Sequence, residues 1–184
     1  MKVTVEKVTS WKRVLNAARE TVGKNPLNKE PSDKWIDSIL YAEHSPIRLV
    51  EYDIKFEGIP NFVATHLVRH HEGCEKFVQS NREDRGGNEP TAVNRLTPVN
   101  MSMTCNAQAL INISRKRLCN CASKETRDVW KEVKNQVASI DSLMAKHMVR
   151  ECVYRGFCPE MKSCGFTTNA LFIEERNKYV SRVR

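Results

Sequence analysis

The clearest pattern of hydrophobic and polar positions along the chain lies between Val50 and Glu57. Four hydrophobic residues alternate there with four charged ones, which is the period-two pattern of a strand with one face in water. Gly58 and Pro60 follow and are expected to end the strand. A shorter alternation over Lys2–Val8 predicts a second strand.

Hydrophobic residues elsewhere recur at helical spacing, and Ser10, Ser32 and Asn61 are placed to cap helices. The helices predicted with definite bounds are Trp11–Val22, Phe62–Gly73, Thr104–Lys124 and Glu125–Val149, and a further one starts at Ser32 and carries Trp35, Ile36, Ile39 and Leu40 on one side. Segment 80–100 is polar and contains glycine and proline, so we expect mostly loop. We expect Cys152–Phe166 to be irregular and the basic tail 167–184 to form a terminal helix. Strands and helices without a βαβ rhythm predict an α+β fold.

Composition and charge favour an anionic ligand. The 184 residues suit one domain, and 30 basic residues against 22 acidic ones give a net charge of +8. Such an excess attracts nucleic acid or phosphorylated small molecules, and composition does not choose between them. The first residues lack the apolar stretch of a secretory signal, and no apolar run could span a bilayer, so we expect a cytoplasmic location.

The chain contains seven cysteines, which we expect to be reduced thiols. Cys152, Cys158 and Cys164 follow one another at a constant interval, wider than the tight cysteine pairs of most zinc sites. A metal held by these three and a fourth ligand stays open as an alternative, although we assign no metal site from the sequence.

The segment His66-Leu67-Val68-Arg69-His70-His71 is one of two that could carry chemistry. On a helix, His66 and His70 lie one turn apart and could share a face. The pair could hold a metal, or the cluster could bind a phosphate and an electron-rich ring. A solvated helix end is the structural alternative.

The second segment is the helix from Asn106 to Arg117, which has one predominantly apolar face. Asn106 and Arg117 are eleven residues apart and return to nearly the same angle, at the edge of that face. An arginine there needs an anion or a hydrogen-bond acceptor, because burying it alone is costly. Exposure of its head to solvent, or an ion pair with Glu125, would be the alternatives.

The first segment resembles a motif of the flavin-dependent thymidylate synthases. That family has an Arg-His-Arg motif followed by a serine and an arginine, where this chain has Arg69-His70-His71, Ser80 and Arg82. Upstream, His44-Ser45-Pro46 resembles the family's His-x-Ser/Thr-Pro segment, which precedes a strand. His71 stands where the family has its second arginine.

The second segment resembles the family's catalytic helix. That helix has an asparagine, a second asparagine six residues later and an arginine eleven residues after the first, which match Asn106, Asn112 and Arg117. Gln108 stands where an arginine is often found. The resemblance covers residues 40–85 and 104–130.

The resemblance assigns roles to individual residues. It implies that Arg117 is catalytic, pairing with the uracil edge and stabilising negative charge there. The residues expected to contact the flavin are Ser45, Arg69, His70, His71, Asn106, Gln108 and Asn112. Those expected to contact the nucleotide are His66, Arg69, Gln79, Ser80, Arg82, Arg95 and Arg117.

The resemblance also implies the reaction and the assembly. The family transfers a one-carbon unit from methylenetetrahydrofolate to dUMP, with FAD as cofactor and NADPH as the source of reducing equivalents, in a homotetramer with shared active sites. It implies one domain over 1–166, with a twisted, mainly antiparallel sheet flanked by helices. Two alternatives are hydroxymethylation of a pyrimidine nucleotide and a non-catalytic protein that binds nucleotide or nucleic acid, the latter being less favoured.

Overall fold

A four-stranded antiparallel sheet forms the base of the protein in the computed structural model, which describes residues 1–80 and 94–181. The strands are β1 (Lys2–Lys7), β2 (Glu51–Pro60), β3 (Cys74–Val78) and β4 (Pro98–Asn106), in the spatial order β1-β2-β4-β3. The predicted α+β class is confirmed, as are both predicted strands.

Strand β2 lies inside the sheet, and its alternating pattern supplies one fully hydrophobic face. Tyr52, Ile54 and Phe56 are buried, whereas Lys55 and Glu57 on the other face are exposed. β1 pairs with one edge of β2, with Val5 opposite Ile54, and β4 pairs with the other edge.

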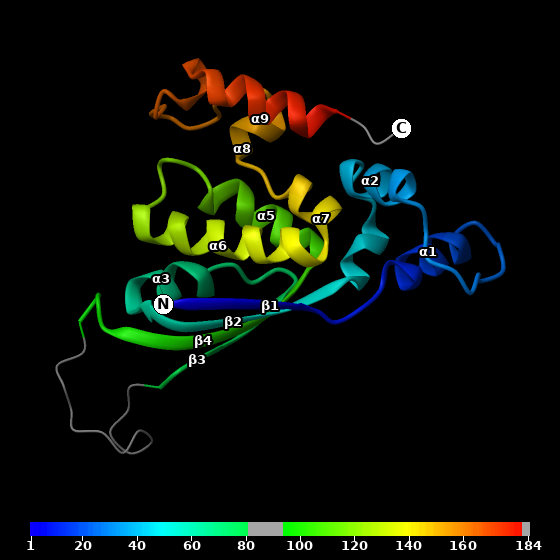
Figure 1. The fold of residues 1–184 in the computed structure, drawn as a ribbon, viewed down its shortest axis with the longest axis horizontal. Helices are drawn as coiled ribbons and strands as arrows, with labels where there is room; N and C mark the ends of the chain where they lie inside the picture. The colour runs from blue at the N-terminus through cyan, green and yellow to red at the C-terminus, as the bar shows by residue number, and fades with distance from the viewer. Residues whose placement is uncertain (81–93, 182–184) are drawn as a thin grey trace.

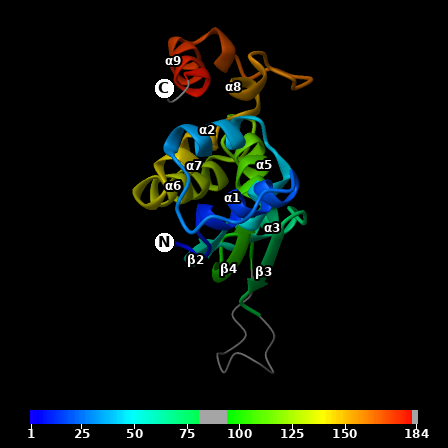
Figure 2. The same ribbon diagram turned by 90° about the vertical axis from the view of Figure 1, so that its right-hand side faces the viewer.

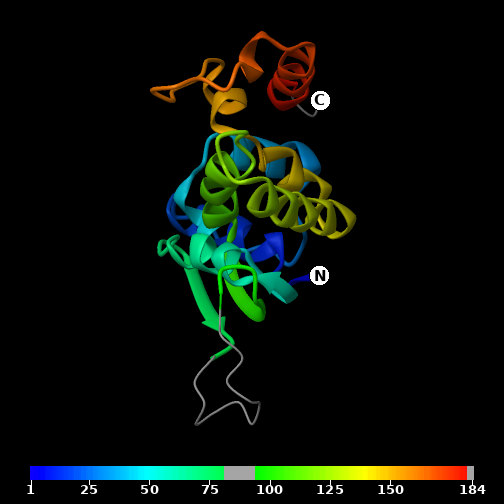
Figure 3. The ribbon, with the colours of Figure 1, turned by 90° about the vertical axis from the view of Figure 1, so that its left-hand side faces the viewer.

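Several helices cover the buried face of the sheet. The helical segments within the described residues are α1 (Trp11–Glu20), α2 (Asp33–Tyr41), η1 (Ser45–Leu49), α3 (Asn61–Val68), α5 (Ala107–Arg117), α6 (Lys124–Ile140), α7 (Ser142–His147), α8 (Glu151–Arg155), η2 (Phe166–Thr168) and α9 (Ala170–Val180). Figure 1 shows α5, α6 and α7 as a layer above the sheet, with α8 and α9 beyond that layer. Figures 2 and 3 show the same order from the two sides. None of the described helices combines the length and apolar character that crossing a lipid bilayer requires.

Two of the four strands, β3 and β4, were absent from the sequence-based prediction. The helix predicted over Phe62–Gly73 ends at Val68, and β3 follows it directly after a turn. The loop predicted to reach residue 100 and the helix predicted from Thr104 are wrong over Pro98–Asn106, which forms β4. Hydrophobic and polar residues alternate along β4 and burial follows them, so a strand pattern is present, but it lies next to a long polar segment that favoured loop.

Helix α5 begins at Ala107, later than predicted, because Asn106 caps it. The Asn106 side-chain oxygen accepts a hydrogen bond of 2.9 Å from the backbone N–H of Ala109. The helix predicted over Glu125–Val149 is divided at Asp141, whose backbone leaves the helical region and whose side chain accepts from the N–H of Met144 to cap α7. Part of the segment expected to be irregular forms α8.

The hydrophobic residues form a large and a small cluster. The large one lies between the sheet and α5, α6 and α7. The small one lies within the C-terminal part of the chain, and its buried members are Val149, Cys152, Val153, Phe166 and Tyr179. The C-terminal helices therefore have a limited hydrophobic core of their own.

Candidate active site

The end of α3 and the end of α5 bring an arginine against a histidine. Arg117 Nε donates to His70 Nε2 over 2.8 Å, and Arg117 Nη2 donates to the backbone carbonyl of His66, also over 2.8 Å. A guanidinium has five N–H groups, so these two bonds orient it without saturating it. The two segments singled out in the sequence thus meet at this pair.

Both imidazoles beside Arg117 favour the neutral form. Burial, followed by the positive charge of Arg117, lowers the pKa of His70 to about 4. Burial also lowers the pKa of His66, whose Nδ1 lies 2.9 Å from the hydroxyl of Thr126. A neutral His70 has one ring nitrogen without a proton, which is what accepting from Arg117 requires.

We expect the His70 ring to titrate near pH 4 in an NMR pH titration, well below the ordinary value of 6.5. Replacing Arg117 with glutamine should raise this pKa, although it should stay below 6.5 because burial remains. Lys2→Gln, on the opposite edge strand of the sheet, serves as the control and should leave it unchanged.

The same shift predicts the direction of a pH effect on stability. Since folded His70 binds its proton more weakly than the unfolded chain does, its contribution is lost as the pH falls from about 6.5 to about 4. A His70 pKa near 6.5 in the folded protein would contradict both expectations.

Further cations gather around this pair. Arg69 and Arg95 lie close enough to His66 to lower its pKa, and the Arg95 guanidinium stacks 4.6 Å from the centre of the Phe62 ring. No carboxylate among the described residues forms an ion pair with Arg117, so the alternative of a salt bridge to Glu125 is not what the structure contains. Half-buried positive charge of this kind suits an anionic ligand.

A cavity of about 740 Å³ lies at the other end of α5. It is lined by three residues predicted to bind a cofactor, Asn106, Gln108 and Asn112, together with Glu43, Arg48, Glu72, Gly73 and Ala109. The Gln108 amide donates to Glu43 Oε2 over 2.7 Å and to Asn112 Oδ1 over 3.2 Å. The lining combines amides with both signs of charge, so it can supply several donors and acceptors to a polar ligand.

Glu43, Arg48 and Glu72 were not predicted from the sequence. Glu43 also pairs with the guanidinium of Arg115, which itself stacks 3.6 Å from the centre of the Tyr154 ring. Glu43 adopts a positive φ of 50°, a conformation uncommon for a residue with a side chain. No periodic pattern marks these three residues, because Glu43 and Glu72 lie in connecting segments and Arg48 lies in η1, which is only five residues long.

Gly73 lies against the Asn106 cap in this cavity. Its φ is +69°, and a Cβ added to it would lie 2.5 Å from the side-chain nitrogen of Asn106. The neighbouring strand residues Cys74 and Cys105 face each other, with their sulfur atoms 2.6 Å apart. The start of β3 is therefore tightly packed against the start of α5.

Replacing Gly73 with alanine should destabilise the fold by roughly 1–3 kcal/mol in urea unfolding, because backbone strain adds to a clash with Asn106. Gly23→Ala is a matched control, since Gly23 has a φ of +67° but no heavy atom within 4 Å of its added Cβ. It should cost only the backbone strain, about 1 kcal/mol. Equal effects of the two substitutions would mean that the Asn106 contact contributes nothing.

The structure separates the predicted residues into two sets within one chain. His66, Arg69, His70, Arg95 and Arg117 gather at one end of α5, whereas Asn106 caps the opposite end, about 16 Å away along the helix axis, and Gln108 and Asn112 lie between, about 13 Å and about 8 Å from Arg117. The cavity that Asn106, Gln108 and Asn112 line contains none of these five cationic or imidazole side chains in its lining.

The remaining predicted residues belong to neither of these two sets. Ser45 is exposed at the start of η1, and His71 is exposed beside His70. The Gln79 side-chain oxygen accepts from the backbone N–H of Asn100 over 3.0 Å. Ser80 is exposed beyond β3, and Arg82 lies outside the described residues.

No protein-family model matches the sequence, and no curated protein is significantly similar to it. Solved structures, however, match the fold. A structure of the flavin-dependent thymidylate synthase ThyX from Helicobacter pylori, complexed with FAD and dUMP, aligns with a TM-score of 0.67 over 82% of this chain and 100% of that chain, at 14% identity. The chain has a flavin-dependent thymidylate synthase fold.

A second structure with this fold is the UMP/dUMP methylase PolB from Streptomyces cacaoi, bound with 5-Br dUMP. It aligns with a TM-score of 0.60 over 85% of this chain and 96% of that chain, at 16% identity. The predicted resemblance is thus confirmed for the thymidylate synthase-like fold.

Proposed function

We propose that this chain is an enzyme that transfers a one-carbon unit to the uracil ring of dUMP, with a flavin as the hydride source. The observation that carries the proposal is the Arg117–His70 pair, in which a half-buried guanidinium is oriented by a neutral imidazole among other cations. A preorganised arginine of this kind stabilises negative charge that develops on a bound ring. The fold it shares with ThyX and PolB supports the proposal, because the structures of those proteins contain dUMP or a brominated analogue.

The cationic set is assigned to the nucleotide. Arg117 pairs with the uracil edge, and Arg69 and Arg95 attract the phosphate together with Ser80 and Arg82. Arg69 and Arg95 are exposed, so a ligand reaches them without opening the core. His66, held by Thr126, contributes its backbone carbonyl to orient Arg117.

The residues of the second cavity fit a flavin. Asn106, Gln108 and Asn112 offer amide donors and acceptors of the kind that the edge of an isoalloxazine ring requires, and the volume of about 740 Å³ suits a ligand of that size. FAD supplies hydride transfer when bound, and the chain's own residues place and orient it. NADPH and methylenetetrahydrofolate are the proposed co-substrates.

We assign the completion of the site to a homotetramer. Neither Arg117 nor His70 lines the cavity of Asn106, Gln108 and Asn112, so one copy contributes the amide set and another contributes the cationic set. Ser45, Arg69, His70 and His71 then reach the flavin of a neighbouring copy, as expected from their exposed or half-exposed positions.

The test begins with an absorption spectrum of the purified protein, repeated after addition of FAD and of dUMP. Retention of FAD through gel filtration, together with release of tritium from C5-labelled dUMP in the presence of methylenetetrahydrofolate and NADPH, is the expected result. UMP should be assayed in parallel, because PolB is a UMP/dUMP methylase. A protein that retains no FAD and releases no tritium from either nucleotide would refute the proposal.

A further inference from the structure

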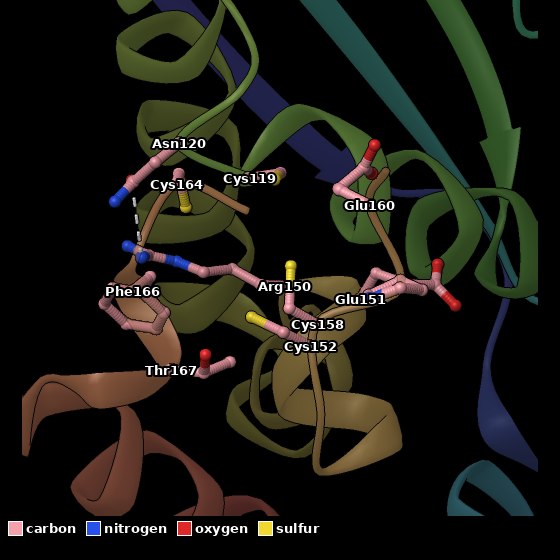
Figure 4. Close-up of a pocket in the computed structure, with 11 residues that line it drawn as sticks. Cys119, Asn120, Arg150, Glu151, Cys152, Cys158, Glu160, Cys164, Phe166 and Thr167 are labelled. Atoms are coloured by element: carbon pink, nitrogen blue, oxygen red, sulfur yellow. Dashed lines mark hydrogen bonds between the residues drawn. The ribbon is translucent and has the colours of Figure 1, made fainter. Parts of the chain in front are cut away.

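Four of the seven cysteines line a small cavity beside the C-terminal part of the chain. They are Cys119, Cys152, Cys158 and Cys164, and the cavity volume is about 10 Å³, space for a single small atom or ion. Figure 4 shows Cys119 and Cys164 on one side of this cavity and Cys152 and Cys158 on the other. Neither the cavity nor these thiols enters the proposed function.

The four thiols come from parts of the chain that are far apart. Cys119 follows α5 in the main body, Cys152 lies in α8, and Cys158 and Cys164 lie in the segment 157–165, which forms neither helix nor strand. A short spacing between two cysteines is expected where neighbouring residues supply the zinc ligands. It is not required where separate segments of the chain supply them. Cysteine packs in protein cores as a small hydrophobic residue, but only Cys152 of these four is buried, so core packing does not account for their convergence.

The C-terminal part of the chain also has only a small hydrophobic core to stabilise it. Its hydrophobic cluster contains few buried residues, and Phe157 and Met161 in the irregular segment are exposed. Small units with limited cores are commonly stabilised by a metal or by covalent cross-links. The contact of Arg115 with Tyr154 is one of the links to the main body.

We propose that Cys119, Cys152, Cys158 and Cys164 bind one Zn²⁺ ion, which fastens the C-terminal helices to the end of α5. Four thiolates in tetrahedral coordination are a preferred ligand set for structural zinc. Within the described residues, no three cysteine, histidine or acidic side chains are already arranged to hold an ion, so binding requires the thiols and the irregular segment to close on it.

The surroundings of the cavity suit a thiolate site. Four thiolates and Zn²⁺ carry a net negative charge, and Arg150 lines the same cavity. Arg150 is fixed by stacking 3.9 Å from the centre of the Phe166 ring and by a 3.4 Å hydrogen bond to Asn120 Oδ1. Arg150 also pairs with Glu175 over 3.6 Å and Glu160 lines the cavity, so Arg150 offsets only part of the excess negative charge. Glu151, which also lines the cavity, is paired with Arg155.

Cys121 offers a matched control. It lies in hydrogen-bond contact with Cys119 and Cys164 and its sulfur lies 3.9 Å from the carbonyl of Lys162, but it does not line the cavity. It is exposed, so serine should replace it without disturbing packing. If zinc binds as proposed, replacing Cys119 should weaken zinc binding, whereas replacing Cys121 should not.

The experiment measures the metal content of the full chain by mass spectrometry after purification without chelators and after reconstitution with ZnCl₂. We expect about one zinc per chain in the natural sequence and in Cys121→Ser. Each of Cys119→Ser, Cys152→Ser, Cys158→Ser and Cys164→Ser should weaken zinc binding by about 100-fold or more, since even outer-sphere partners contribute up to about that factor. Retention of zinc by Cys119→Ser, or its loss from Cys121→Ser, would overturn the ligand set.

A second measurement keeps the proposal testable if a cysteine variant fails to fold. Addition of zinc to the natural chain should remove four thiols from the fraction that reacts with a thiol reagent, and cobalt in its place should give the absorption of a tetrahedral thiolate complex. Chelation should expose the C-terminal helices to limited proteolysis before the sheet. Bound iron instead of zinc, disulfides among these cysteines, or the absence of any metal after reconstitution would each refute the proposal.

Discussion

Replacing Arg117 with alanine is expected to lower the rate of dUMP methylation at saturating substrate by about 100-fold to 1000-fold. The guanidinium is held by His70 and by the His66 carbonyl, so its orientation is prepared before the substrate binds. Alanine removes both the positive charge and the oriented N–H groups, and no other described side chain donates to His70 Nε2. The measurement is tritium release from C5-labelled dUMP.

Two companion variants define what the loss at Arg117 means. Arg117→Lys keeps the charge but not the planar fork, so we expect it to recover only a small part of the rate. Lys116→Ala removes an adjacent exposed cation and should leave the rate within about two-fold, because exposed charges contribute little. If Arg117→Ala retains full activity in a folded, flavin-binding protein, the catalytic role assigned to Arg117 is wrong.

Replacing Asp141 with alanine is expected to destabilise the fold by about 3–5 kcal/mol. Its buried carboxylate accepts hydrogen bonds from Lys7 Nζ at 2.8 Å, Trp11 Nε1 at 2.7 Å and Tyr52 Oη at 2.9 Å. It also accepts from the backbone N–H of Met144, which caps α7. Alanine would leave these donors, one of them charged, without their acceptor in the interior.

Urea unfolding of Asp141→Ala measures this loss, and Asp128→Ala is the matched control. Asp128 pairs with Lys124 on an exposed part of α6, so its replacement should cost less than about 1 kcal/mol. Tyr52→Phe removes a single donor to Asp141 and should cost about 1 kcal/mol. An Asp141→Ala effect no larger than that of Asp128→Ala would show that the buried network contributes little to stability.

The hydrogen-bond network around Asp141 was not predicted from the sequence. Lys7 and Asp141 are 134 positions apart, and Trp11 and Asp141 are 130 apart. Asp141 was placed inside a continuous predicted helix, because one polar residue hardly changes a periodic pattern. Its interaction with β1, α1 and β2 coincides with the break between α6 and α7.

Local patterns identified several elements correctly. The alternation between Val50 and Glu57 predicted β2, since one face of the strand is buried and the other faces solvent. The Ser32 side chain accepts from the N–H of Trp35, as expected of a helix cap. Asn106 and Arg117 share one side of α5, since eleven residues complete about three turns.

Patterns failed where an element was short or bordered a polar segment. β3 has five residues, and those at its exposed end carry no alternation of burial. The start of β4 follows a segment rich in turn residues, which favoured loop over strand. Pairing with β2 places Pro98–Asn106 in the sheet, and this pairing depends on residues that are distant in the chain.

By itself, the sequence determined which residues could carry chemistry here: a cluster of histidines and arginines, a helix with amides and a terminal arginine, and an abundance of cysteines. The tertiary structure decided which of them meet. It joined Arg117 to His70, separated that pair from Asn106 and Asn112 along α5, and gathered four cysteines from separate segments around one cavity. The physical reason is that periodicity reports which face of a local element is buried, whereas long-range contacts depend on how the buried faces pack together.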